Sequence, residues 1–344
     1  MLRIGLIGLG EVHVAHVQGY RLASDKAVLT AVCDRDGALA EARGKEYGAA
    51  VFTDYMELLE NGDVDAVDIM LPHSAHEAAI LAALDHGKHV LVEKPLAPSL
   101  MAVERVIARA SETGLTVAVA ENTRFVRAYQ AVERILATGS LGSIEFVRTV
   151  ICGNELKRLS NRNLWKGRRD GTVGGVILDS GAHSFYLLRW LFGMVNTIGA
   201  YAAKRVQASE VEDMAVVVGS LDSGANFATE YVFTAAIPWS ERLEVYGSEG
   251  SLIVDQLANP VVKRFHGSDD QEGAAVEGVP YWPGTWKSRS MADEIVEFVT
   301  SVVEGRSFPV SLDYLRDVAQ IIDAAYGSLE ALRVRNVRDG GADA

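Results

Sequence analysis

The first third of the chain alternates short apolar runs with amphipathic stretches. Five runs are apolar almost throughout, as are strands buried on both faces of a parallel sheet: residues 2–7, 28–34, 64–71, 89–93 and 116–120. The amphipathic stretches between them predict helices at residues 12–23, 38–47, 75–86 and 99–113. Strands and helices in this order predict a doubly wound parallel sheet of the Rossmann type, with right-handed crossovers.

The pattern changes after about residue 125, where strands begin to follow one another without helices between them. The expected strands are residues 143–153, 213–221, 225–234, 242–246 and 251–254, and the expected helices are 127–138, 175–191, 292–303 and 312–332. Asp222-Ser223-Gly224 is a typical hairpin turn between two of the strands. This half is predicted to be an open-faced, mainly antiparallel sheet with helices on one face. The expected domains are therefore residues 1–125 and 126–344.

Composition and charge narrow the classes of function. The 344 residues suffice for two domains, and 49% hydrophobic with 23% charged residues is typical of a globular protein. The formal net charge of -13 disfavours nucleic acid and anionic membranes as partners. No segment offers the roughly eighteen uninterrupted apolar residues that span a bilayer. Cys33 and Cys152 lack a metal-type spacing, which predicts a reduced, cytoplasmic protein without a metal.

A glycine turn follows the first predicted strand and opens the first predicted helix. Gly8 permits the tight turn, and Gly10 lets a pyrophosphate approach the backbone. Glu11 and Val12 begin the helix, whose free N–H groups attract phosphate. The third glycine of the usual G-x-G-x-x-G motif is replaced by His13, which weakens the motif but leaves its context intact.

Asp34 ends the second predicted strand, near the spacing of about 20 residues at which an acid binds the adenosine ribose. A helix N-cap is the other interpretation of Asp34, and the two roles are compatible. A carboxylate at this position repels a 2′-phosphate, so NAD is the expected cofactor. NADP stays open, because the neighbouring Arg35 could accept that phosphate.

Further motifs resemble one family. Residues 87–97, GKHVLVEKPLA, are similar to the "GKHV…EKPLA" signature of the Gfo/Idh/MocA oxidoreductases, the family of glucose–fructose oxidoreductase and inositol dehydrogenase. Residues 71–76, LPHSAH, resemble its P-x-x-x-H segment, and His16 falls where the family often has a histidine. Residues 174–183, GGVILDSGAH, resemble its GG…D-x-G-x-H motif. The resemblance spans nearly the whole chain.

The resemblance implies a Rossmann domain followed by an open-faced sheet that commonly forms a dimer or tetramer interface. Family members mostly oxidise or reduce one carbinol carbon of a sugar, cyclitol or related small molecule. Lys94, Asp179 and His183 match the family's catalytic set. The matching motifs add further residues to the expected cofactor site: Leu71, Pro72, His76 and Glu93, with Lys94 beside them.

Oxidation of a hydroxyl needs a base that takes its proton as hydride departs. Lys94 lies just past the carboxyl end of a predicted parallel strand, where ligands gather, and burial is expected to lower its pKa. Asp179 and His183 are four residues apart, so one helix would carry both on one face. Lys94 and His183 are expected to face the nicotinamide across a cleft between the domains. Which of the two is the base stays open.

Candidates for binding the substrate are Asn122, Arg124, Arg168, Arg169 and Trp282. Asn122 and Arg124 belong to an N-x-R-F segment that the family has beside its cleft, although Arg124 equally suits an interdomain ion pair. Arg168 and Arg169 end a basic run in residues 157–169, which is either a clamp for a carboxylate or phosphate or a solvated face. Trp282 lies in an aromatic segment that forms either a sugar-binding wall or a core plug.

Three functions fit these patterns. The first is a dehydrogenase or reductase that transfers hydride between NAD(P) and a neutral or anionic sugar or polyol. The second is an NAD-dependent glycosidase or lyase that oxidises its substrate transiently. The third is a non-catalytic dinucleotide-linked regulator, against which the intact set of Lys94, Asp179 and His183 argues. A homodimer or homotetramer through the C-terminal sheet is expected in each case.

Overall fold

The N-terminal part of the molecule is built on a six-stranded parallel sheet. The computed structural model describes residues 1–267, 269–282 and 284–331. The sheet order is β3-β2-β1-β4-β5-β6. Its strands are β1 (Leu2–Ile7), β2 (Ala27–Cys33), β3 (Ala50–Phe52), β4 (Ala66–Ile69), β5 (His89–Glu93) and β6 (Val117–Ala120). The order reverses between β1 and β4, which places a ligand-binding switch point at their carboxyl ends.

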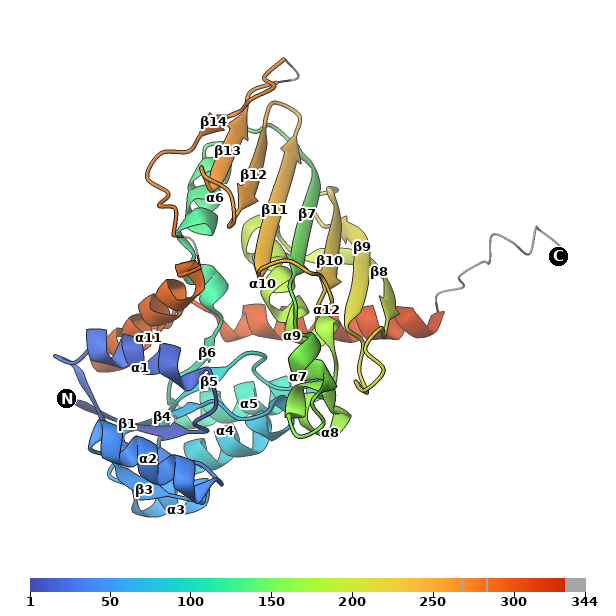
Figure 1. The fold of residues 1–344 in the computed structure, drawn as a ribbon. Coiled ribbons are helices and arrows are strands. Elements are labelled where there is room, and N and C mark those ends of the chain that lie inside the picture. The colour runs from blue at the N-terminus through green and yellow to red at the C-terminus, as the bar shows by residue number, and fades with distance from the viewer. Residues whose placement is uncertain (268, 283, 332–344) are drawn as a thin grey trace.

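Helices cover both faces of this sheet (Figure 1). They are α1 (His13–Leu22), α2 (Gly37–Tyr47), α3 (Tyr55–Asn61), α4 (His76–Asp85) and α5 (Leu100–Thr113). Asp36 and Ser99 begin α2 and α5 by accepting backbone N–H groups, and Gly48 and Gly114 end them in the left-handed conformation. α4 packs against both α3 and α5.

The second half of the chain forms an eight-stranded sheet with the order β14-β13-β12-β11-β7-β10-β9-β8. Neighbouring strands are antiparallel except β7 and β10, which are parallel. The strands are β7 (Ile144–Cys152), β8 (Val195–Ala203), β9 (Met214–Leu221), β10 (Asn226–Val232), β11 (Ser240–Gly247), β12 (Ser251–Asp255), β13 (Val262–Phe265) and β14 (Ala274–Ala275). The fold class predicted from the sequence is thereby confirmed.

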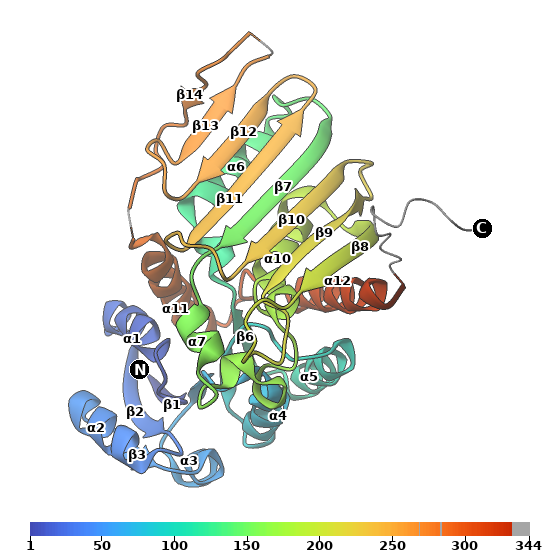
Figure 2. The same ribbon diagram turned by 45° about the vertical axis from the view of Figure 1, so that its right-hand side comes forward.

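Helices lie on one face of the second sheet, and the other face is open (Figure 2). The helices behind the sheet are α6 (Arg127–Ala137), α9 (Val176–Asp179), α10 (Gly181–Phe192) and α12 (Leu312–Ala331). Two short helices, α7 (Leu156–Ser160) and α8 (Arg169–Thr172), lie beside the Rossmann part, below the second sheet (Figure 1). Val216 and Val218 of β9 are exposed while Val217 between them is buried, as expected for a strand with one solvated face.

The last two helices of the described chain return to the Rossmann part. α11 (Trp286–Glu304) packs against α1, and α12 packs against α5 as well as α10. The approach of α11 depends on Gly19 of α1, because a Cβ there would overlap the side chain of Ile295. Helices α11 and α12 of the second part thus pack against α1 and α5 of the first. A boundary between two domains at residues 125 and 126 stays a proposal.

The sequence missed several elements, and one predicted helix is interrupted. β3, α3 and β8 were not expected, because β3 and α3 are short and β8 lacks a clean alternation of buried and exposed residues. The predicted helix at 175–191 is divided into α9 and α10 at Ser180. Residue 332, the predicted end of the last helix, lies outside the described residues. No helix in the described part of the chain is long and apolar enough to cross a membrane.

Candidate active site

The glycine turn after β1 combines a tight backbone contact with an open approach. Gly8 has a φ of 92°, and a Cβ added to it would lie 2.6 Å from the carbonyl oxygen of Met70. A Cβ on Gly10 would meet no atom within 4 Å. The backbone N–H groups of Gly10, Glu11 and Val12 make no hydrogen bond within the described residues. This set of free donors in front of α1 fits the pyrophosphate of a dinucleotide.

His13 occupies the position of the missing third glycine. Its ring is buried, with Nδ1 against the carbonyl oxygen of Gly10 and Nε2 3.0 Å from the hydroxyl of Tyr47. The turn is thus joined to the end of α2 by side-chain hydrogen bonds.

Asp34 lies beside the glycine turn at the end of β2. Its Oδ2 accepts the N–H of Leu9 at 2.8 Å, and its Oδ1 accepts the N–H of Asp36 at 3.0 Å. The N-cap interpretation of Asp34 was wrong, because the side chain that caps α2 is that of Asp36. Asp34 instead holds the turn at the edge where a ribose would lie. Arg35 is exposed next to it.

Lys94 and Asp179 meet at the carboxyl end of β5. The ammonium of Lys94 donates to the backbone oxygen of Asp179 at 2.9 Å and also contacts its carboxylate. Lys166 donates to the second carboxylate oxygen of Asp179 at 3.3 Å. Nε2 of His73 lies 4.0 Å from that carboxylate. The peptide bond between Lys94 and Pro95 is cis.

These contacts reverse one expectation about Lys94. Burial lowers its pKa, but the charges of Asp179 and Glu93 outweigh burial and raise the pKa above its ordinary value. Burial likewise raises the pKa of Asp179, but Lys166 and Lys94 together hold it well below the ordinary value. Burial lowers the pKa of His73 to about 3. Lys94 is therefore a fixed cation and Asp179 a fixed anion, while His73 is neutral.

His183 lies on the next helical segment and has a different partner. Its Nδ1 lies 2.7 Å from Oε1 of Glu121, directly after β6, and 3.5 Å from the hydroxyl of Thr123. Glu121 was not among the residues predicted from the sequence. Glu121 could have been found from its position, because it is a carboxylate directly after a predicted parallel strand. Lys94 was predicted from a position of the same kind.

A sealed layer of polar groups lies nearby. His16 of α1 bridges Asp68 of β4, at 2.8 Å, and Glu93 of β5, at 3.1 Å. Tyr20 also donates to Asp68, at 3.0 Å. Burial lowers the pKa of His16, but the two carboxylates outweigh burial and raise it well above the ordinary value. Within the described residues there is no group of three or more histidines, cysteines or carboxylates that could hold a metal.

The other predicted cofactor residues surround this region. Leu71 and Pro72 follow β4 and precede His76 at the start of α4. The ring of His76 is buried between two backbone oxygens, 2.9 Å from that of Leu71 and 2.7 Å from that of Pro95. His76 thus joins the loop after β4 to the loop after β5. Glu93 faces His16 instead of the surface.

Two of the candidate substrate residues are engaged within the protein. The amide of Asn122 donates to the hydroxyl of Ser290 in α11 at 2.8 Å. Arg124 pairs with Glu133 of α6 at 3.1 Å, and its guanidinium lies 4.1 Å from the ring of Trp190. The Arg124 pair crosses the proposed limit between residues 125 and 126.

In the basic run of residues 157–169, some side chains lie on the surface and one points toward the Asp179 carboxylate. Arg168 pairs with Asp170 on the exposed surface, with 3.0 Å between Nε and Oδ1. Arg169 contacts the backbone oxygen of Glu210 at 3.3 Å. Only Lys166, among these three, reaches the Asp179 carboxylate. Trp282, farther along the chain, lies 4.6 Å from the guanidinium of Arg289.

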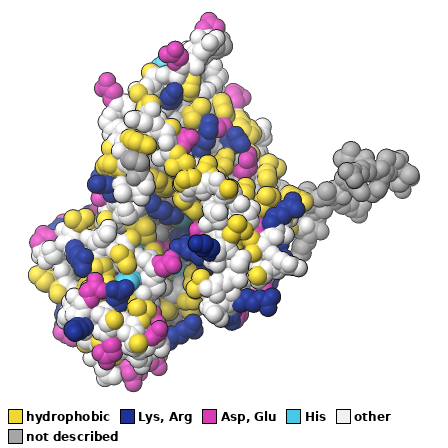
Figure 3. All heavy atoms as spheres, in the orientation of Figure 1, with side chains coloured by type: hydrophobic (Ala, Val, Ile, Leu, Met, Phe, Trp, Pro, Cys, Tyr) yellow, Lys and Arg dark blue, Asp and Glu magenta, His cyan; other side chains and the backbone are white. Residues whose placement is uncertain are grey.

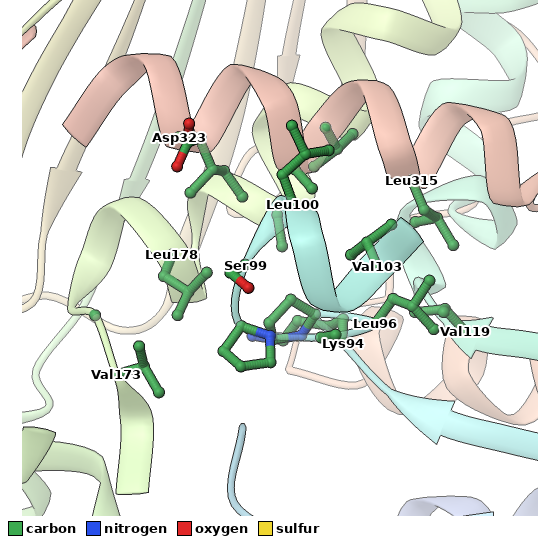
Figure 4. A pocket seen from close by; sticks show the side chains of 18 of the residues that line it. Lys94, Leu96, Ser99, Leu100, Val103, Val119, Val173, Leu178, Leu315 and Asp323 are labelled. Carbon is green, nitrogen blue, oxygen red and sulfur yellow. The ribbon is translucent and has the colours of Figure 1, made fainter. Parts of the chain in front are cut away.

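Two hollows adjoin these residues. The surface is hollowed between the Rossmann part and the second sheet, with Lys and Arg side chains gathered beside the hollow (Figure 3). A cavity of about 220 Å³ lies between α5, α9 and α12, with Lys94 and Glu121 in its wall. Figure 4 shows that Val103, Leu178 and Leu315 contribute to a largely apolar lining. That lining does not match the many hydroxyls of a polyol.

Comparison with known proteins identifies the class. Residues 2–121 match the model of an oxidoreductase family with an NAD-binding Rossmann fold, Gfo/Idh/MocA, and residues 129–253 match the C-terminal domain of the same family. The chain belongs to this family, as its motifs indicated. It is an NAD-dependent dehydrogenase or reductase, and NAD is its cofactor.

Individual relatives cover much of the chain. It is 27% identical over 341 residues to myo-inositol 2-dehydrogenase of Thermotoga maritima, covering 96% of this chain and 97% of that protein. It is 31% identical over 262 residues to dTDP-3,4-didehydro-2,6-dideoxy-alpha-D-glucose 3-reductase of Streptomyces violaceoruber, covering 75% and 74%. The crystal structure of an oxidoreductase domain protein from Kribbella flavida superimposes with a TM-score of 0.86 and 26% identity, covering 96% and 97%.

Proposed function

We propose that this protein transfers hydride between NAD and one carbinol carbon of a sugar, a cyclitol or a derivative of either. The observation that carries the proposal is the meeting of Lys94, Asp179 and Lys166 at the carboxyl end of β5. His183 and its partner lie beside them, at the end of β6. The named relatives act on an inositol and on a nucleotide-linked sugar, which supports a polyhydroxylated substrate.

The cofactor side is formed by the glycine turn and Asp34. Free N–H groups of Gly10, Glu11 and Val12 would hold the pyrophosphate, and Asp34 would receive the ribose hydroxyls. When bound, NAD accepts hydride in the oxidised form and donates it in the reduced form. Asp34 favours NAD over NADP, since its carboxylate would repel a 2′-phosphate.

The catalytic side divides two tasks between Lys94 and His183. Lys94 is a fixed cation, so it is suited to donate a hydrogen bond to the substrate oxygen and to stabilise the charge that develops there. A fixed cation has no lone pair for a proton, so we assign proton acceptance in oxidation to His183. Asp179, held between Lys94 and Lys166, orients the Lys94 ammonium.

Substrate recognition is assigned to side chains around the catalytic set. Lys166 is the member of the basic run placed to sense an anionic substrate, since it reaches the catalytic carboxylate. Arg168 is paired with Asp170, and Arg169 contacts the backbone oxygen of Glu210. Both stay candidates for the outer rim. Asn122 and Arg124 belong to η2 (Asn122–Phe125), and Trp282 lines a small hollow together with Phe125 of η2 and Ser290 of α11. All three stay candidates.

A homo-oligomer through the open face of the second sheet is the expected assembly. That face exposes Val216, Val218 and Tyr201, with Val216 opposite Tyr201 on the neighbouring strand. Exposed apolar side chains in a patch mark an interaction site. Val218→Asp is expected to convert the oligomer to a monomer in light scattering, and a monomeric wild-type protein would refute the interface. We further place the protein in the cytoplasm, which its two free cysteines support.

The test of the activity is a substrate screen with the purified protein. Inositols, aldoses, uronates and nucleotide sugars are offered with NAD, and the corresponding ketones with NADH, with absorbance of the reduced cofactor as the signal. Turnover of at least one polyhydroxylated compound, absent in Lys94→Ala, is the expected result. Tight binding of NAD without turnover of any of them in either direction would contradict the proposal.

A further inference from the structure

Glu121 stands at the carboxyl end of β6 and touches the residue to which proton transfer is assigned. Its Oε1 lies 2.7 Å from Nδ1 of His183 and accepts the N–H of Thr123 at 3.2 Å. Both side chains are nearly sealed, since 1% of Glu121 and 6% of His183 is exposed. A hydrogen bond this well shielded from water holds the two groups in one relative geometry.

The contact determines which nitrogen of His183 carries a proton. Burial raises the pKa of Glu121, but the charge and the hydrogen bond of His183 outweigh burial and lower it, so the carboxylate is ionised. An ionised carboxylate only accepts hydrogen bonds, and Nδ1 must therefore donate to it. The lone pair of the neutral imidazole is then on Nε2. Nε2 makes no hydrogen bond within the described part of the chain.

Other charged groups face this pair from the surrounding elements, but each is separately engaged or neutral: Glu93, Lys94, Asp179 and Glu294. Glu93 of β5 accepts from His16, and Lys94 is paired with Asp179 of α9. Burial raises the pKa of Glu294 of α11 well above its ordinary value, so this carboxyl is protonated. Glu121 is thus the charged partner available to His183.

We propose that Glu121 is a positioning residue, which holds His183 in the Nδ1–H tautomer so that Nε2 accepts the substrate's hydroxyl proton. The proposal rests on the proposed function and assigns its proton path. In oxidation the O–H bond breaks and its proton goes to Nε2. The C–H bond breaks and its electron pair leaves as hydride to oxidised NAD, and the carbon becomes a carbonyl. Glu121 takes no proton and stabilises the imidazolium through its charge.

The direct test needs no substrate. The full chain, with histidine labelled by an NMR-active nitrogen isotope, is titrated with pH, and the signals of His183 are assigned by their loss in His183→Asn. The expected neutral form carries its hydrogen on Nδ1. In Glu121→Gln, which keeps the shape but removes the charge, the amide can donate or accept, so a mixture of both His183 tautomers is expected. A neutral wild-type form with hydrogen on Nε2, or an unchanged tautomer in Glu121→Gln, would overturn the proposal.

Kinetics separate positioning from a structural role. With any substrate found in the screen, Glu121→Gln is expected to lower kcat at least about 10-fold, less than the roughly 10²–10⁴-fold loss from removing a general base. Its pH profile of kcat is also expected to differ from that of the wild type, which a merely structural role of Glu121 would not cause. Glu294→Gln is the matched control, an isosteric change at a buried carboxyl without contact to His183, and should keep kcat within about 2-fold.

The outcomes distinguish this proposal from the proposed function. If no sugar or polyol is turned over, the proposed function fails, and the NMR titration still decides the role of Glu121. If turnover is found and Glu121→Gln keeps both the wild-type kcat and the wild-type pH profile, the positioning role is refuted. Retained NAD binding in fluorescence titration shows that the variant is folded.

Discussion

Two buried pairs of histidine and carboxylate lie in the same part of the molecule and differ in one respect. His16 has both ring nitrogens engaged by carboxylates and no exposed side-chain surface. His183 has one nitrogen engaged by Glu121 and keeps a small exposed surface. The first pair is closed to proton exchange with a ligand, whereas in the second Nε2 of His183 has no hydrogen-bond partner among the described residues.

The difference shows that residue type and burial alone do not mark a catalytic histidine. The carboxylates that face His16 raise its pKa well above the ordinary value, so that it is a permanent cation joining α1 to β4 and β5. A permanent cation holds strands together but neither accepts nor returns a proton near neutral pH. The number of engaged ring nitrogens therefore separates a structural histidine from one that can exchange protons.

The largest expected effect is a loss of kcat on changing His183, of the pair with Glu121, or Lys94 beside it. His183→Ala and Lys94→Ala should each lower kcat by about 10²–10⁴-fold, because one removes the proton acceptor and the other removes the charge at the substrate oxygen. NAD affinity should stay close to that of the wild type, since neither residue belongs to the glycine turn. Steady-state rates and fluorescence titration on the same preparations check both points. Near-normal kcat in either variant would remove that residue from the mechanism.

Changing His16, which is paired with Asp68 and Glu93, should lower the free energy of unfolding. His16→Leu leaves Asp68 and Glu93 without their shared cation in a buried site, and breaking a buried ion pair costs about 3–5 kcal/mol. Urea denaturation followed by circular dichroism measures the change in the free energy of unfolding. His266→Leu makes the same substitution at an exposed site and should have almost no effect. Equal stabilities of the two variants would mean that His16 is not a structural cation.

The two pairs also show how far the sequence could predict this molecule. The alternation of apolar runs and amphipathic stretches depends on neighbouring residues, so the strands β1, β2, β4, β5 and β6 and the doubly wound sheet could be predicted, whereas the order of the strands in the sheet was not. The glycine turn and Lys94 could be placed because both lie at the carboxyl ends of such strands. These are local signals with a fixed position in the fold.

The partners could not be predicted because they are distant in the chain. Lys94 and Asp179 are separated by 85 residues, and Glu121 and His183 by 62. The pKa of Lys94 was expected to fall because burial was considered without Asp179, whose charge reverses the shift. In the basic run, side-chain direction depends on the fold of the segment between α7 and α8, which contains Lys166, so the sequence could not show which lysine turns toward Asp179.

A smaller effect, on the choice of cofactor, is expected at Asp34, whose carboxylate is only partly buried. Asp34 lies at the glycine turn, and Asp34→Ser removes the charge that would repel a 2′-phosphate while keeping an acceptor for Leu9. The ratio of NAD to NADP affinity should fall by about 10-fold, which corresponds to roughly 1.4 kcal/mol. Parallel titrations with both cofactors measure this ratio. A wild-type protein that prefers NADP would contradict the role assigned to Asp34.

An effect of pH on stability is expected at Glu294, which is buried between the two pairs and, within the described residues, has no hydrogen-bond partner for either carboxylate oxygen. Its pKa is raised well above 4.5 by burial, so the folded protein keeps a proton that the unfolded chain releases near 4.5. The stability contributed by this protonated carboxyl is complete below pH 4.5 and is lost as pH rises toward the raised value, by at most about 1.4 kcal/mol per pH unit. Glu294→Gln does not titrate, so its stability relative to the wild type should increase across that window and then level off. Thermal denaturation of both proteins at a series of pH values measures the difference. A difference that is independent of pH would mean that Glu294 is ionised in the folded protein, and the layer between His16 and His183 would then hold one more negative charge than we infer.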